Sequence, residues 1–174
     1  MKPEDMIREL PGPPVEEWIA MLPAGTHRER HAFLKEQGLS SNHASAVLWW
    51  EKNGAAIEAG GEPLIERQYV GKEPLRPIYD RVAAVIAGFG DVEIGPRGTY
   101  VSFGRPKQFA LVQPSTKTRV DVGLRLPGAA ATERLRAAGS FGSGNNTHRV
   151  ALASQDEVDA ELEGWLRAAY DARG

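Results

Sequence analysis

Apolar and polar residues alternate almost strictly from residue 118 to residue 126, which predicts a β-strand with one buried face. The polar side of this strand carries Arg119, Asp121, Gly123 and Arg125. Two runs rich in aromatic, β-branched and other apolar residues precede it, at 99–103 and 108–112. Glycine, proline and serine separate the runs and favour tight turns, so we expect neighbouring antiparallel strands.

Helical periodicity flanks the predicted sheet on both sides, because apolar residues recur there at the spacing of one helix face. We expect helices over residues 15–22, 26–37, 41–53, 78–89, 129–139 and 154–169. Further strands are expected over 91–94 and 148–153. Thr26 with Glu29, and Ser154 with Glu157, have the form of capping boxes that open two of the helices.

This order of elements predicts an α+β fold. We expect a small N-terminal three-helix module, followed by an antiparallel sheet packed with flanking N- and C-terminal helices. The helical module is expected over residues 1–54 and the sheet domain over 73–174. Between them, Gly60-Gly61 and Pro63 predict a linker over 55–72.

Composition narrows the class of protein. The 174 residues are 41% hydrophobic and 25% charged with a net charge of −2, as in ordinary globular proteins and unlike proteins coated with positive charge. The absence of cysteine excludes disulfides, thiolate nucleophiles and cysteine-ligated metal sites. No apolar run reaches the roughly 18 residues of a membrane helix, and the first residues lack a signal-peptide core. We therefore expect a cytoplasmic protein with no membrane partner.

Positive charge is concentrated in and beside the predicted sheet, whereas acidic residues gather in the C-terminal helix. Cations beside hydroxyl groups suit phosphates and carboxylates, and an aromatic ring could add a wall for stacking. The candidate ligand-binding residues are Tyr100, Arg105, Lys107, Ser115, Lys117, Arg119 and Arg125. We expect this face to bind an anionic small molecule or nucleic acid. The alternative is a solvated sheet edge whose cations only prevent aggregation.

Histidines offer a second kind of candidate site. His27 and His31 are four residues apart on a predicted helix, so both could bind one metal ion, with His43 as a third ligand. The metalloprotease pattern requires glutamate directly after the first histidine, and Arg28 stands there instead. Histidines without a ligand role are the alternative, and we expect no cofactor.

Catalysis has only one candidate pair, His148 and Asp121, since a carboxylate can orient an imidazole for acid–base work. The alternative is that Asp121 pairs with Arg119 or Arg125. Neither a G-x-S-x-G elbow nor a phosphate-binding glycine motif is present. The sequence therefore favours a non-catalytic binding protein over an enzyme, with a small hydrolase or a protein-interaction scaffold as alternatives.

Specific strings also support a resemblance. The run RPIYDRVAAVIAGFGDVEIGPRGTYVSFGRPKQFALVQPSTKTRVDVGLRL, with THRVALASQDEVDAELEGWLRAAYDA, resembles a bacterial domain family of unknown function, sometimes labelled a predicted transport-protein domain. HRERHAFLKEQGLSSNHASAVLWWEK resembles a second uncharacterised helical family, often fused in front of the first. The order of helix, sheet and helix is more distantly similar to small iron-chaperone-like and double-wing DNA-binding domains, which is an analogy of fold order alone. The resemblance implies no activity and no catalytic residues.

Overall fold

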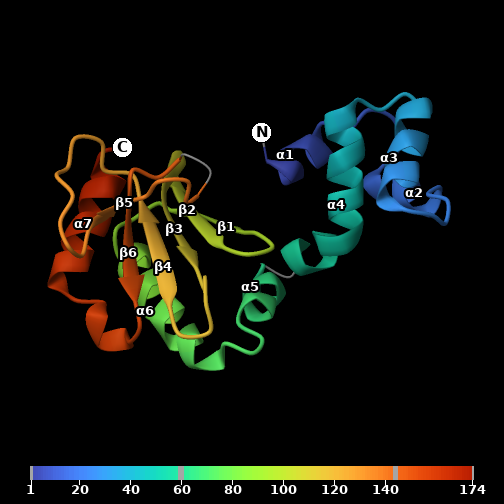
Figure 1. The fold of residues 1–174 in the computed structure, drawn as a ribbon. Helices are drawn as coiled ribbons and strands as arrows, with labels where there is room; N and C mark the ends of the chain where they lie inside the picture. The colour runs from blue at the N-terminus through green and yellow to red at the C-terminus, as the bar shows by residue number, and fades with distance from the viewer. Residues whose placement is uncertain (1, 59–60, 143–144, 174) are drawn as a thin grey trace. The chain divides into compact units, whose positions relative to one another are not determined.

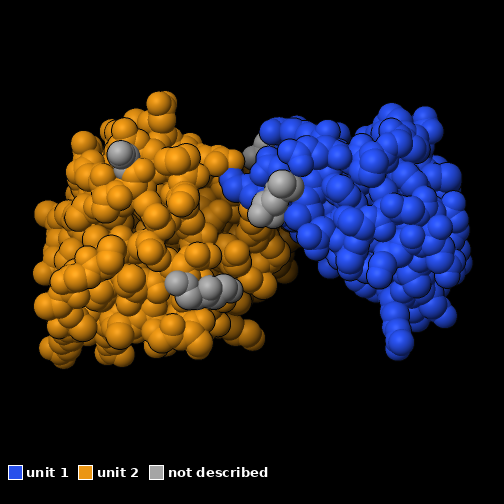
Figure 2. Space-filling view, turned by 90° about the horizontal axis from the view of Figure 1, so that it is seen from above, with its two compact units in different colours: residues 1–60 blue, residues 61–174 orange. Residues whose placement is uncertain are grey.

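The structure, a computed structural model, describes residues 2–58, 61–142 and 145–173. Its elements are labelled in Figure 1. The chain divides into two compact units, residues 1–60 and residues 61–174, which Figure 2 shows in separate colours. We call the first the helical unit and the second the sheet unit. Together they confirm the predicted α+β class.

The described part of the helical unit contains α1 (Pro3–Arg8), α2 (Val15–Ala20), α3 (His27–Glu36) and α4 (Ser41–Glu58). The last three are the helices that the sequence predicts, and α1 is an additional short one. Their apolar stripes meet in a common core, where Trp18, Leu34 and Val47 are buried. Burial of these stripes stabilises α2 and α3, which are too short to be stable alone.

Helix α3 begins with the capping box expected from the sequence. The backbone N–H of Thr26 donates to the Glu29 carboxylate at 2.7 Å, and the Glu29 N–H donates to the Thr26 hydroxyl at 3.3 Å. Two N–H groups at the start of the helix are thereby satisfied. These hydrogen bonds from the Thr26 backbone and hydroxyl lower the pKa of Glu29 below its usual value of 4.5.

This lowered pKa predicts how the helical unit responds to acid. The ionised Glu29 carboxylate stabilises the fold fully at pH values above the pKa that Glu29 has in the unfolded chain. This stabilisation is lost as the pH falls through the lower pKa that Glu29 has in the folded protein. We expect Glu29→Gln to destabilise the unit most at neutral pH and progressively less in acid. Urea unfolding measures this difference in a Trp165→Phe background, where the fluorescence comes only from Trp18, Trp49 and Trp50 of the helical unit. A difference that does not change with pH would contradict the expectation.

The sheet unit begins with α5 (Glu62–Gln68), the 3-10 turn η1 (Glu73–Leu75) and α6 (Arg76–Ala87). The strands are β1 (Glu93–Pro96), β2 (Val101–Arg105), β3 (Lys107–Gln113), β4 (Val120–Leu124), β5 (Arg136–Ala137) and β6 (His148–Leu152). The 3-10 turn η2 (Gln155–Glu157) and α7 (Ala160–Asp171) follow. The strands form one antiparallel sheet in the order β1-β2-β3-β4-β6-β5, which confirms the predicted hairpin neighbours.

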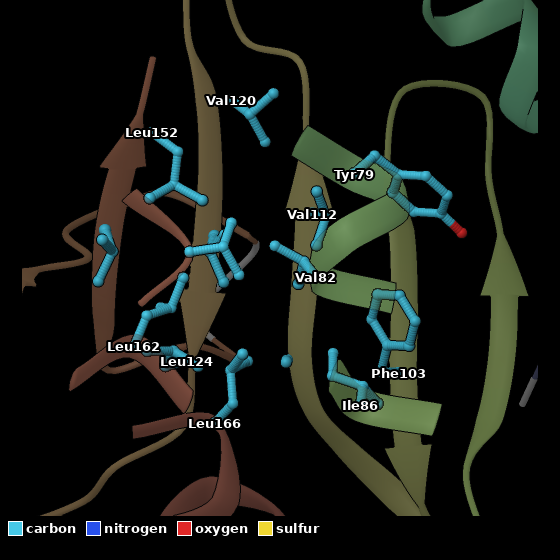
Figure 3. Close-up of a cluster of buried hydrophobic side chains, with 14 of the residues drawn as sticks. Tyr79, Val82, Ile86, Phe103, Val112, Val120, Leu124, Leu152, Leu162 and Leu166 are labelled. Atoms are coloured by element: carbon cyan, nitrogen blue, oxygen red, sulfur yellow. The ribbon is translucent and has the colours of Figure 1, made fainter. Parts of the chain in front are cut away.

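The core of the sheet unit lies between one face of the sheet and the helices α6 and α7 (Figures 1 and 3). Helix α6 contributes Tyr79, Val82 and Ile86, and α7 contributes Leu162 and Leu166. They pack against the alternating apolar residues of the strands, among them Phe103, Val112, Val120, Leu124 and Leu152. Each such side chain contributes about 1.5–3 kcal/mol by leaving water.

The described residues of 55–72, which were expected to be a linker, are largely helical, because α4 continues into them and α5 lies within them. Gly60, half of the predicted Gly60-Gly61 joint, lies outside the described residues. Leu64 and Tyr69 are buried in this segment, so it carries core residues of its own. Gly61 has a φ of +79° and forms the left-handed turn before α5. Pro63 lies in the first turn of that helix, where proline is tolerated. The signals for a break therefore mark a helix start.

The helix predicted over 129–139 is wrong, since these residues form turns and the short strand β5. Alanine and leucine favour a helix there only weakly, and tertiary contacts override that preference. Leu135 is buried in the core, and its N–H donates to the Thr132 hydroxyl at 2.9 Å. Arg134 donates to carboxylates at the start of α7, which fixes the extended path of the chain.

The C-terminal helix also starts later than the sequence predicts. The carboxylate of Glu157 accepts a hydrogen bond from the N–H of Ser154 at 3.1 Å, but this capping box begins the 3-10 turn η2 and not α7. Helix α7 has its own N-cap, Asp159, whose side chain accepts the N–H of Leu162 at 3.0 Å. That hydrogen bond, together with Arg134, lowers the pKa of Asp159.

Candidate anion-binding face of the sheet

Side chains of the sheet alternate between two faces, and the pairing register shows which residues share a face. The face opposite the core, here called the second face, contains a row that crosses four strands. Leu111 pairs with Gly123, Gly123 pairs with Arg149, and Arg149 pairs with Arg136. Asp121 lies on this face as well, two positions along β4 from Gly123, as the alternation predicts.

The second face is more buried than a solvated face would be. Asp121 is only 2% exposed. Its carboxylate lies 3.2 Å from the Nε of Arg119, and the side chain of Arg119 is 43% exposed. The pairing of Asp121 with Arg119, one of the two alternatives from the sequence, is therefore the arrangement found. One of the predicted cations is thus already neutralised by a buried carboxylate.

Three other arginines gather on the second face, and we call Arg125, Arg136 and Arg149 the arginine triplet. Arg136 and Arg149 stand directly opposite each other across β5 and β6. Arg125 follows β4 two positions beyond Gly123, so it is a diagonal neighbour of Arg149, at about 7–8 Å between Cα atoms. Among the described residues, no carboxylate forms an ion pair with any member of the triplet. Three uncompensated cations therefore share one small area.

The described residues on either side of 143–144 cover the centre of this face. Asn146 is 5% exposed and lies against Gly123, where an added Cβ would come within 2.5 Å of the Asn146 Nδ2 atom. That Nδ2 group is buried without a hydrogen-bond acceptor in the described part of the chain. Leu111, on the same face, is 1% exposed. Gly123 therefore leaves space for the polar side chain of Asn146 on the second face.

The basic residues that the sequence groups into one surface lie at opposite ends of the sheet. Arg105 and Lys107 pair with each other at the β2–β3 turn, whereas Ser115 and Lys117 lie in the β3–β4 turn. Strand β3 separates the two turns and is seven residues long, so the ends are about 20 Å apart. The predicted residues therefore do not form one compact site.

Several of these residues also have structural contacts. The guanidinium carbon of Arg105 lies 4.3 Å from the ring centroid of Tyr170, a close cation–π contact. The Ser115 hydroxyl is buried and has no hydrogen-bond partner among the described residues. Tyr100 uses its backbone carbonyl to accept the side-chain amide of Gln68 at 3.0 Å. Lys117 is exposed in its turn.

The structure does not bring His148 and Asp121 together. His148 pairs with Leu124, three positions along β4 from Asp121, so the two side chains point to opposite faces. His148 is 6% exposed, and its Nδ1 lies 2.8 Å from the Thr147 hydroxyl. The acid–base pair expected from the sequence is therefore not formed in this arrangement.

His27 and His31 share one side of α3, as predicted, with ring centroids 6.3 Å apart. The Nε2 of His31 lies 3.1 Å from both the Ser41 carbonyl oxygen and the Ser45 hydroxyl, so it links α3 to α4. His43 contacts the Ser40 hydroxyl through Nδ1 at 3.0 Å. The described residues contain no group of three or more histidine, aspartate or glutamate side chains that could hold a metal ion.

Sequence reasoning missed two members of the triplet, Arg136 and Arg149. Arg136 lies in the segment that was expected to be helical. Arg149 alternates with the buried residues His148, Val150 and Leu152 of β6, so period-2 alternation would have placed it on the outer face. The pairing of β5 with β6 has no local sequence signal, because it depends on the register of a two-residue strand.

Comparisons with known proteins give a family and nothing more specific. No described helix is both long and apolar enough to cross a membrane. No curated protein and no solved structure matches the chain significantly. A family model described as a domain of unknown function, DUF5655, matches residues 65–173, which is more than half of the chain and nearly the whole sheet unit. The chain therefore belongs to the DUF5655 family.

Proposed function

We propose that the sheet unit binds a small phosphate-bearing anion through the arginine triplet, as a binding protein rather than an enzyme. The observation that carries the proposal is the direct cross-strand pairing of Arg136 with Arg149. Like charges directly opposite each other destabilise a sheet. A bound anion would remove this repulsion, because it would lie between the two guanidinium groups and pair with both.

Arginine suits this role because its planar guanidinium can donate two parallel hydrogen bonds to one phosphate. The triplet is also held by neutral partners that leave its charge uncompensated. The Nε of Arg136 donates to the Glu133 carbonyl at 3.1 Å, and Arg125 donates to the Asn145 carbonyl at 3.4 Å. Arg149 lies 6.0 Å from the ring centroid of Phe141. Such positioning lowers the entropy that ligand binding would cost.

Of the ligand-binding residues that the sequence predicts, Arg125 alone belongs to the proposed site. Arg105 and Lys107, at the β2–β3 turn, and Ser115 and Lys117, at the β3–β4 turn, lie outside the proposed site. Arg119 lies on the same face, but Asp121 neutralises it at 3.2 Å. The transport role suggested by the resemblance would need the same ability to hold a small ligand, and nucleic acid remains an alternative ligand for the same arginines.

Differential scanning calorimetry of the full chain with inorganic phosphate tests the proposal. A ligand that binds only the folded state raises the melting temperature, by on the order of 5 °C at ten times its Kd. We expect Arg149→Gln to abolish most of this rise and Lys117→Gln, a matched loss of one charge, to preserve it. An equal rise in both variants would contradict the proposal. A larger, strongly salt-sensitive rise with single-stranded oligonucleotides would identify nucleic acid as the ligand instead.

A further inference from the structure

A depression of about 330 Å³ adjoins the arginine triplet at the β5–β6 edge of the sheet. It is lined by Glu133, Arg134, Arg136 and Ala151. Arg136 belongs both to this depression and to the triplet, so the two features are continuous. Ala151 lies two positions beyond Arg149 on β6 and therefore shares its face. A ligand held by the triplet could extend into the depression without leaving the second face.

Arg134 forms a wall whose position and charge are fixed by the protein. Its guanidinium donates to Asp159 at 2.8 Å and to Glu161 at 2.9 Å, and it also donates to the Glu157 carbonyl. The same group lies 5.7 Å from the ring centroid of Trp165. Two carboxylates therefore neutralise Arg134, so it shapes the depression without adding to its attraction for anions.

Glu133 gives the depression a chemistry different from that of the triplet. Its carboxylate forms no ion pair with the described residues, and its backbone carbonyl accepts the hydrogen bond that orients Arg136. A free carboxylate accepts hydrogen bonds from hydroxyl or amino groups and repels a second acidic group. The small, exposed side chain of Ala151 leaves space between these groups. A volume near the lower end for ligand pockets suits a body of pentose or nucleobase size.

We propose that the ligand is a phosphomonoester with a neutral polar body, such as a pentose phosphate or a nucleoside monophosphate. This inference rests on the proposed function, because the phosphate would bind the arginine triplet. The body would lie in the depression over Ala151, and one of its hydroxyl or amino groups would donate to the Glu133 carboxylate. The same carboxylate would disfavour ligands with an acidic group at both ends.

Isothermal titration calorimetry with inorganic phosphate, ribose 5-phosphate and adenosine monophosphate tests this inference. Ribose 5-phosphate places a sugar in the depression, and adenosine monophosphate adds a base, so the two arms distinguish the kind of body. We expect at least one of them to bind roughly 10-fold more tightly than phosphate, because a hydrogen bond to a charged group contributes about that much.

Two substitutions in the lining of the depression test whether the organic part of the ligand binds there. Ala151→Leu fills the depression on an exposed strand position, and Glu133→Ala removes the acceptor. We expect Ala151→Leu to reduce binding of the organic phosphate to the level of inorganic phosphate while leaving phosphate binding unchanged. We expect Glu133→Ala to remove the preference for the organic phosphate over inorganic phosphate, with both affinities measured in that variant. If phosphate binds through Arg149 but neither organic phosphate binds more tightly, this inference is wrong and the proposed function stands. If Arg149→Gln leaves phosphate binding intact, the proposed function itself is wrong.

Discussion

Replacement of Phe103 by alanine is expected to destabilise the sheet unit by about 3–5 kcal/mol, because removal of a buried aromatic side chain loses its burial and leaves a cavity. Phe103 is fully buried in β2, and its ring centroid lies 6.5 Å from that of Tyr79 on α6 (Figure 3). It therefore joins the sheet to the helix that covers it. A loss of this size is a large fraction of the 5–15 kcal/mol typical of a domain.

Urea unfolding followed by the amide NMR signals of β3 and β4 measures this loss in the sheet unit alone. Ile94→Ala is the matched control, because Ile94 is the cross-strand neighbour of Phe103 on β1 but is 51% exposed. We expect the control to cost about 1 kcal/mol or less. Equal losses for the two variants would show that the core does not lie where the structure has it.

Gly142→Ala is expected to destabilise the sheet unit by about 2–4 kcal/mol, through backbone strain and crowding together. Gly142 has a φ of +74°, a backbone conformation that residues other than glycine adopt only at a cost in free energy. An added Cβ would lie 1.9 Å from Asn146 Nδ2 and 2.9 Å from Leu111 Cδ2. Asn146 cannot move away easily, since it is confined against Gly123 as well.

Gly139→Ala is the control that has the backbone strain without the crowding, so its difference from Gly142→Ala measures the crowding. Gly139 has a φ of +59° in the same connection between β5 and β6, but no atom of the described residues lies within 4 Å of its added Cβ. We expect a cost of about 1 kcal/mol there from the backbone alone. The same NMR-monitored unfolding compares the two variants. If Gly142→Ala were no less stable than Gly139→Ala, Asn146 would not fill the space between Gly123 and Gly142.

Local patterns in the sequence were sufficient to predict much of the fold. The alternation over 118–126 predicted β4 and the face on which Asp121 lies, because a period of two follows directly from strand geometry. The periodicity over 78–89 likewise predicted α6, whose Val82 and Ile86 are buried. Both signals are contained within a single element and do not depend on its partners.

The errors arise where long-range contacts decide. The segment 129–139 has a composition that tolerates a helix, and what prevents one is the burial of Leu135 and the attachment of Arg134 to residues about 25 positions away. The pairing of Arg136 with Arg149 is a consequence of that path. No local pattern in either strand reveals it, which is why two members of the candidate site were missed.

The predicted basic surface shows the opposite problem. Arg105, Lys107, Lys117 and Arg119 are close in sequence, yet hairpin geometry places the first two at one end of the sheet and Lys117 at the other. Each reversal of the chain separates neighbouring turns by the length of a strand. Closeness of the basic residues in the sequence therefore did not mean that their charges are close in space.

The most direct test of the account is a phosphate titration that follows the arginine Nε–Hε signals by NMR. If the arginine triplet binds the anion, the signals of Arg125, Arg136 and Arg149 will shift together and saturate at one common Kd. Those of Arg105, which stacks on Tyr170, and Arg119, which pairs with Asp121, will change little. Shifts centred on Arg105 or Arg119, with the triplet unaffected, would contradict the central claim.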